Sequence, residues 1–168
     1  LASAYGVFAN GGYLVSPWLV QRISDGRGSV LFESDRTATP AEDARAIDAR
    51  NAFVTDSMLR EVTRTGTAAS ASQRLGRDDL AGKTGTTNDA VDGWFAGYAN
   101  DIVSVAWMGY DDPKSLGGRE FGSTLALPIW TQVIGKAPPK RYPADPFKAP
   151  EPLKKSRACA ISNQLATT

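Results

Sequence analysis

The 168-residue sequence predicts an α+β fold in which helices cover an antiparallel sheet. Three runs between residues 80 and 110 are rich in β-branched and aromatic residues, and short turns separate them. Segments before and after these runs show helical spacing of apolar residues. The composition, 42% hydrophobic and 22% charged, is typical of one globular domain that is large enough to bury a core.

The first third of the chain predicts a short helix followed by a hairpin. Leu1, Tyr5 and Phe8 follow helical spacing, and the N-G-G sequence at residues 10–12 supplies a left-handed helix end. Extended runs follow at residues 13–15, 18–23 and 30–32, and the last two flank a turn-rich stretch at 24–29. We interpret the resulting hairpin as structural, and residues 37–43 as a linker.

A second helix is predicted after Asp48, which is a good helix-capping residue. Val54, Met58 and Val62 recur every fourth residue, so we expect this apolar face to pack into the core and the helix to end near residues 65–66. Residues 67–79 are small or charged. We expect them to form a loop that leads into the strand beginning at Leu80.

Two more strands are predicted at residues 94–99 and 102–110, with a turn at 100–101. The run at 102–110 is apolar on both faces, which favours a central strand, and the short turns favour an antiparallel meander. A loop at 112–122 follows. Pro128 then suits the start of a helix that would place Ile129, Val133 and Ile134 on one side, lying across the meander.

The sequence divides into a domain at residues 1–136 and a proline-rich tail at 137–168. The formal net charge is +1, and the basic clusters at 136–141 and 154–157 fall at the tail, so we expect no nucleic-acid partner. No apolar run approaches the roughly 20 residues that span a bilayer, so no membrane segment is expected in this chain. Because the chain opens on Leu1 within a helical pattern, we interpret it as an internal or C-terminal piece of a longer protein.

The residue types present exclude several kinds of catalysis within this chain. There is no histidine, which excludes a Ser-His-Asp triad, a Cys-His pair and a histidine-ligated metal site. The single Cys159 forms neither an internal disulfide nor a thiolate metal cluster.

The stretch at residues 80–87, L-A-G-K-T-G-T-T, predicts a substrate-binding strand. Thr84 and Thr86 share one face of an extended strand, Lys83 adds a cation, and Gly85 opens the backbone to a ligand that pairs as an added strand. A phosphate-binding P-loop is excluded because its first glycine falls at Arg77. A lysine that merely protects a strand edge remains an alternative, since a K-T-G tripeptide occurs by chance in roughly one such chain in twenty.

The wider pattern carries more information than the tripeptide. It includes residues 80–89, D-G-W-F-A-G-Y at 92–98, R-T-G-T-A at 64–68, L-A-L-P-I-W at 125–130 and the helix with its N-G-G end at 2–12. In these motifs and their order the sequence resembles penicillin-binding transpeptidases, with the closest likeness to class A, bifunctional proteins of the 1A kind, over about residues 1–136.

The resemblance implies a role for each residue of this strand, which would lie at the edge of a five-stranded antiparallel sheet. Lys83 would support a serine-containing second motif and add positive potential. The hydroxyls of Thr84 and Thr86 would hold the terminal carboxylate of a D-Ala-D-Ala peptide stem or a β-lactam, and Thr87 at the end of the strand would also belong to the substrate-binding residues. The backbone N–H of Thr86 would be an oxyanion-hole donor, and Gly85 would give the acyl donor room to pair.

The resemblance also implies that part of the active site lies outside this chain. The Ser-x-x-Lys and Ser-x-Asn motifs of the family are not found in residues 1–168, and the first two strands of the family sheet should precede the nucleophile. We therefore expect the chain to need the N-terminal remainder of the same protein and to be inactive alone. No metal or organic cofactor is implied, and the complete protein would be anchored at the outer, periplasmic face of the cytoplasmic membrane.

Three alternatives share the K-T-G strand. Two are enzymes, a monofunctional transpeptidase and a serine β-lactamase relative. The third is a non-catalytic module that senses penicillin or binds the cell wall.

Overall fold

The computed structural model describes residues 1–34, 45–99, 102–137, 149–154, 156–159, 162 and 165. The linker predicted at 37–43, the turn predicted at 100–101 and most of the predicted tail lie outside these described residues. The elements are α1 (Ala2–Ala9), β1 (Arg22–Ser24), β2 (Val30–Glu33), α2 (Ala49–Arg64), α3 (Ala69–Leu75), β3 (Leu80–Thr86), the 3-10 turn η2 (Asn88–Ala90), β4 (Gly93–Ala99), β5 (Ile102–Met108) and α4 (Ala126–Lys136).

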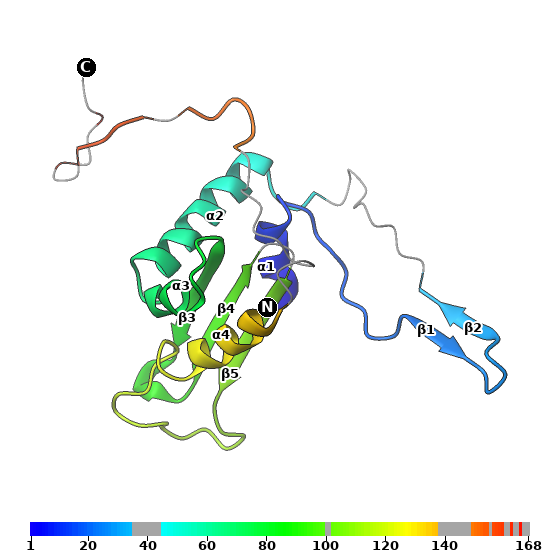
Figure 1. Ribbon diagram of the computed structural model, residues 1–168. Helices are drawn as coiled ribbons and strands as arrows, with labels where there is room; N and C mark the ends of the chain where they lie inside the picture. The colour runs from blue at the N-terminus through cyan, green and yellow to red at the C-terminus, as the bar shows by residue number, and fades with distance from the viewer. Residues whose placement is uncertain are drawn as a thin grey trace.

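The main sheet is the predicted antiparallel meander, with strand order β3-β4-β5 and helices around it (Figure 1). The register pairs Thr84 with Phe95 and Phe95 with Ala106, and it continues without a shift along all seven residues of each strand. The α+β class is therefore confirmed. The prediction that residues 102–110 form the central strand is wrong for the described sheet, because β4 is central and β5 is an outer strand.

One face of the sheet packs against α4 and α3. Phe95 meets Trp130 of α4 with ring centroids 4.8 Å apart, and the Trp130 indole donates to Ser104 O on β5 at 3.1 Å. Leu127 and Ile134 of α4 are also buried in this core. The helix lies across the meander as predicted, but of the three residues predicted on one side of it only Ile134 is buried, whereas Ile129 and Val133 are exposed.

On the other face, β4 meets α2 through polar groups, and α1 also lies against β4. Tyr98 of β4 donates to the Asp56 carboxylate of α2 at 2.8 Å, and Arg60 pairs with the same carboxylate at 2.7 Å. The prediction that this face packs into the core is right at Val62, which lies against the core, and wrong at Val54 and Met58, which are 46% and 59% exposed. The helix instead buries smaller or polar side chains, and Asp56 tolerates burial because both of its oxygens have partners.

Residues 67–79 are not the loop that we predict from the sequence, because they contain the helix α3. Alanine is the best helix former, and Ala71 is buried against the core. The helix ends at Gly76, whose φ of 61° is the left-handed conformation of many helix ends.

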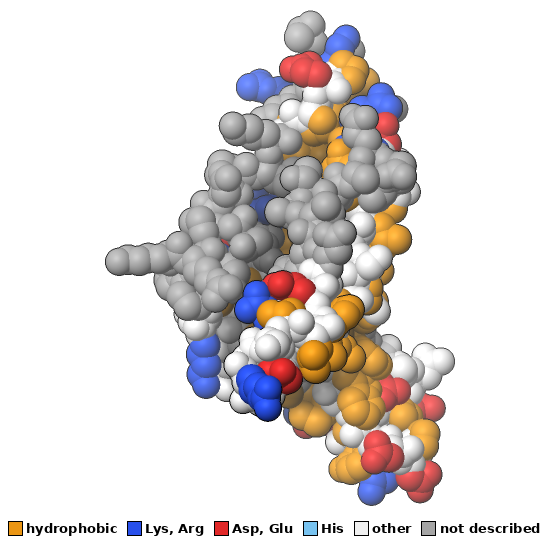
Figure 2. Space-filling view, turned by 90° about the vertical axis from the view of Figure 1, so that its right-hand side faces the viewer, with side chains coloured by type: hydrophobic (Ala, Val, Ile, Leu, Met, Phe, Trp, Pro, Cys, Tyr) orange, Lys and Arg blue, Asp and Glu red, His pale blue; other side chains and the backbone are white. Residues whose placement is uncertain are grey.

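The β1–β2 hairpin is confirmed and projects away from the sheet and helices (Figure 1). Its apolar side chains Ile23, Val30 and Phe32 are each about half exposed. Figure 2 looks onto the side from which the hairpin projects and shows hydrophobic side chains at the surface among charged ones. Within the described residues, no helix is both long and apolar enough to cross a membrane.

Candidate functional site

β3 is an outer strand whose two halves differ. Its first three residues are buried, whereas Lys83 and Thr86 are exposed. The Thr63 hydroxyl on α2 donates to Leu80 O at 2.6 Å and fastens the first half. The first half of β3 is therefore fixed to α2, while the second half is more accessible to solvent. None of the other described strands pairs with the outer edge of β3.

The predicted site residues Lys83 and Thr84 lie together. The Lys83 ammonium donates to Thr84 O at 3.1 Å and to Thr84 Oγ1 at 3.2 Å. A third group joins them, because Thr67 Oγ1 lies 3.0 Å from Thr84 Oγ1. Sequence reasoning assigns no role to Thr67, although it belongs to the R-T-G-T-A motif at 64–68.

Thr86 is tied to the loop that precedes α4. The backbone N–H of Gly122 donates to Thr86 Oγ1 at 3.0 Å. A Cβ at Gly122 would collide with the carbonyl oxygens of Trp94 and Gly85, so only glycine fits here. The Thr86 hydroxyl accepts this bond with a lone pair and keeps its proton for a further partner.

Gly85 lies between these two hydroxyl groups on the opposite face of the strand. A Cβ added there would stand 3.2 Å from Cβ of Trp94, its cross-strand partner. This approach is tighter than ordinary van der Waals contact, so glycine lets β3 and the Trp94 side chain lie close together.

Thr87 closes the turn after β3. Its N–H donates to Asp92 O at 3.1 Å, and its hydroxyl accepts from the Asp92 N–H at 2.8 Å. Within the turn Asp89 and Ala90 have φ of 59° and 51°, which costs each residue of order 1–2 kcal/mol. The turn is held from outside by Ser115, whose hydroxyl donates to Asp89 O at 2.8 Å.

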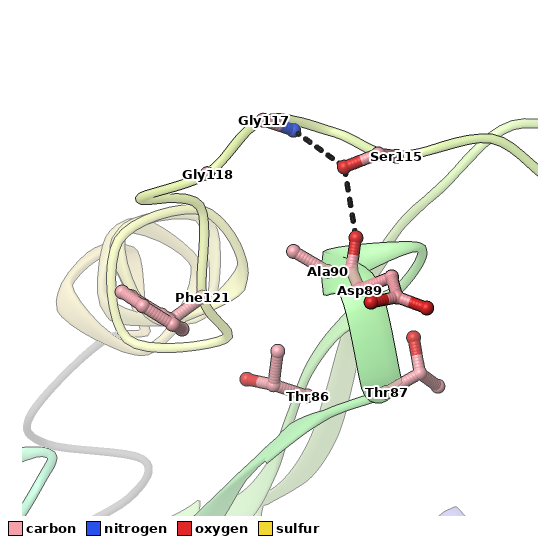
Figure 3. Close-up of a pocket in the computed structure, with 8 residues that line it drawn as sticks. All are labelled: Thr86, Thr87, Asp89, Ala90, Ser115, Gly117, Gly118 and Phe121. Carbon is pink, nitrogen blue, oxygen red and sulfur yellow. Dashed lines mark hydrogen bonds between the residues drawn. The ribbon is translucent and has the colours of Figure 1, made fainter.

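A hollow of about 440 Å³ opens beside the end of β3 (Figure 3). Thr86 and Thr87 line it from the strand, and the loop before α4 provides the facing wall, which includes Phe121. A larger hollow of about 530 Å³ lies against the hairpin at residues 19–22. That second hollow is lined by Arg22, whose charge is already paired with Glu33, and by none of the predicted site residues.

Two ionisable groups near the site have shifted pKa values. Burial, and then the nearby Asp56 carboxylate, raise the pKa of the Tyr98 phenol, so that it stays a hydrogen-bond donor. Burial acts to raise the pKa of Asp79, which immediately precedes β3, but hydrogen bonds and nearby positive charge, chiefly from the bidentate ion pair with Arg77, lower it overall. Tyr98 is the cross-strand partner of Ala81, so both groups lie at the buried first half of β3.

The family model described as the penicillin binding protein transpeptidase domain matches residues 1–135. The chain is 42% identical over 151 residues to penicillin-binding protein 1A of Neisseria flavescens, covering 90% of this chain and 19% of that protein. It is 39% identical to penicillin-binding protein 1A of Pseudomonas aeruginosa, covering 82% of this chain and 22% of that protein. The chain thus spans about a fifth of the length of these curated relatives.

The fold is also similar to that in a crystal structure of penicillin-binding protein 1A from Haemophilus influenzae. The TM-score is 0.87 at 26% identity, and the match covers 99% of this chain and 30% of the other. The resemblance predicted from the motifs is therefore confirmed, together with the fold that it implies.

Proposed function

Because the chain belongs to the penicillin-binding protein transpeptidase domain family, we propose that it forms the substrate-holding wall of a peptidoglycan D,D-transpeptidase. The observation that carries this proposal is the second half of β3, a partly exposed stretch of an outer strand with a lysine and two threonine hydroxyls. The curated relatives are named penicillin-binding proteins, and we propose that penicillins and other β-lactams acylate the same site here.

In this proposal the D-Ala-D-Ala end of a peptide stem adds to the free edge of β3 as a short strand. Its carboxylate would accept hydrogen bonds from Thr84 and Thr86, with the Lys83 ammonium close by and Thr87 closing the end of the strand. A β-lactam carboxylate would take the same place.

The Thr86 N–H would then stabilise the oxyanion that forms when a serine attacks the D-Ala-D-Ala carbonyl. Such a donor is worth about 2.7–4 kcal/mol. The serine oxygen bonds to the carbonyl carbon, the peptide bond breaks, and D-Ala leaves with the proton on its amine. An amine of a second stem then displaces the serine and forms the cross-link.

The serine and its neighbouring lysine would come from a part of the protein outside these 168 residues, and we place the assembled domain on the outer face of the cytoplasmic membrane. The chain alone should then neither be acylated nor fold normally. Covalent labelling of the isolated chain by a fluorescent penicillin would overturn this division of roles.

The test of the function is Lys83→Ala in the full-length protein. We expect penicillin acylation to fall about 100-fold, because a charge-assisted contact worth about 2–3 kcal/mol is lost. Lys136→Ala, at the exposed end of α4, is the matched control and should acylate normally. Unchanged acylation in Lys83→Ala, with unchanged folding, would indicate that Lys83 is only a solvated lysine on a strand edge.

The same labelling experiment separates the alternatives. Labelling followed by transfer of the acyl group to an amine is expected for a transpeptidase. Rapid hydrolysis of the penicilloyl adduct would instead identify a β-lactamase relative, and binding without any covalent adduct would identify a sensing or wall-binding module.

A further inference from the structure

We propose that Thr67 is a positioning residue of this site, which orients the single proton of the Thr84 hydroxyl toward the ligand carboxylate. The inference deepens the proposed function and rests on it. Thr67 comes from the segment between α2 and α3, so the site would be built from two separate parts of the chain.

Two groups from the protein converge on Thr84 Oγ1. The Lys83 ammonium lies 3.2 Å away and can only donate. Thr67 Oγ1 lies 3.0 Å away and can either donate or accept. A threonine hydroxyl has one proton and two lone pairs, so the direction of the Thr67–Thr84 bond decides where the Thr84 proton points.

A carboxylate ligand fixes that direction because an ionised carboxylate only accepts hydrogen bonds. Thr84 must give its proton to the ligand, and its lone pairs are then free to accept from Lys83 and Thr67. Thr67 thus becomes the donor in a chain that runs from Thr67 to Thr84 to the carboxylate. Hydrogen bonds in such a chain polarise and strengthen one another.

Among the described residues, the Thr67 hydroxyl has no hydrogen-bond partner other than Thr84. It can therefore donate to Thr84 without breaking another hydrogen bond among the described residues. The neighbouring Thr65 differs, since its hydroxyl lies 2.7 Å from the Glu61 carboxylate and is directed at α2 rather than at β3.

The fold holds Thr67 in place from both sides. A Cβ at Gly66 would lie 2.9 Å from the Val62 Cα, so glycine lets the chain pass closely over the last turn of α2. On the other side Ala68 is fully buried, and its N–H donates to Val62 O at 3.2 Å. The backbone that carries Thr67 is thus fixed relative to α2, and α2 is fixed to β3 by Thr63.

The test uses the full-length protein and the second-order rate of acylation by two probes, a penicillin and its methyl ester. Thr67→Val removes the hydroxyl and keeps the shape. We expect acylation by the penicillin to slow about three- to ten-fold, the loss of one hydrogen bond, while acylation by the ester is unchanged. Thr67→Ser should restore the normal rate, and Thr65→Val is the matched control, which should leave both rates unchanged.

The double variant Thr67→Val/Thr84→Val tests whether Thr67 acts through Thr84. If it does, the double variant is no slower with the penicillin than Thr84→Val alone. Equal slowing of penicillin and ester in Thr67→Val would indicate a merely structural role and overturn the inference, as would no slowing at all. A wild-type protein that penicillin does not acylate would overturn the proposed function itself, and this inference with it.

Discussion

The two outer strands of the sheet, β3 and β5, have the same position relative to β4 but carry different chemistry. The free half of β3 presents a lysine and hydroxyl groups, whereas β5 contains no charged residue at all. Of β5 only Ala106 is buried, and Trp107 is 44% exposed. Neither outer edge is paired with another of the described strands.

This difference indicates two kinds of partner. A charged residue on a strand edge discourages permanent pairing with another strand, so the β3 edge suits a ligand that binds and leaves. An uncharged, apolar edge such as β5 suits a permanent neighbour. The curated relatives are about five times as long as this chain, so they contain further residues that could supply such a neighbour.

The largest effect is expected where the loop before α4 is pinned to β3. In Gly122→Ala the new methyl group collides with the carbonyl oxygens of Trp94 and Gly85, which are backbone atoms that move only together with the sheet. We expect the free energy of unfolding to fall by about 2–4 kcal/mol. Chemical denaturation measures it.

Gly118 in the same loop provides the matched control. A Cβ there meets nothing within 4 Å, so Gly118→Ala should leave the free energy of unfolding unchanged or raise it by up to about 1 kcal/mol. If both variants were equally stable, the loop would not be fixed to β3 and the contrast between the two strands would lose its main structural support.

The sheet and the K-T-G strand were predictable because their signals are local. Apolar and aromatic runs with short turns define the meander, and residues 80–87 carry their chemistry within one strand. Sequence spacing identified α2 and its ends but gave the wrong face at Val54 and Met58, because burial of Asp56 depends on Tyr98, which lies 42 positions later in the chain. No helical periodicity contains that information.

The support of the site was missed for the same reason. Thr67 and Thr84 are 17 positions apart, and Gly122 and Thr86 are 36 apart, so only the folded chain brings these pairs together. The motif R-T-G-T-A was visible as part of a resemblance, but nothing in its residues alone indicates which hydroxyl it contacts.

A smaller effect is expected at the base of β3, where Asp79 pairs with Arg77. The pKa of Asp79 is lowered in the folded protein, so the ion pair stabilises the fold at pH values above 3.8, the ordinary pKa of this carboxyl group. This stability is lost as the pH falls below 3.8 toward the lowered pKa. Asp79→Asn should cost about 1–2 kcal/mol at pH 7 and progressively less in acid.

Unfolding curves of the wild-type protein and Asp79→Asn between pH 7 and pH 3 measure how the difference in their free energies of unfolding shrinks in acid. A constant difference across that range would show that Asp79 acts through packing rather than through its charge. β5 offers a comparison, because it has no ionisable residue and contributes no pH dependence of its own.

The smallest effect on stability is expected on β5. Val103 is only partly buried, so Val103→Lys should change the free energy of unfolding by less than about 1 kcal/mol. If the 168-residue chain associates through this open edge, Val103→Lys should reduce the association, because a lysine on an open strand edge disfavours edge-to-edge pairing. Sedimentation velocity at several concentrations measures the association. Val20→Lys, near the base of the exposed hairpin, tests the second apolar surface. If Val20→Lys abolishes association and Val103→Lys does not, the chain associates through the hairpin and not through β5. The two outer strands would then differ only in the ligands that they suit.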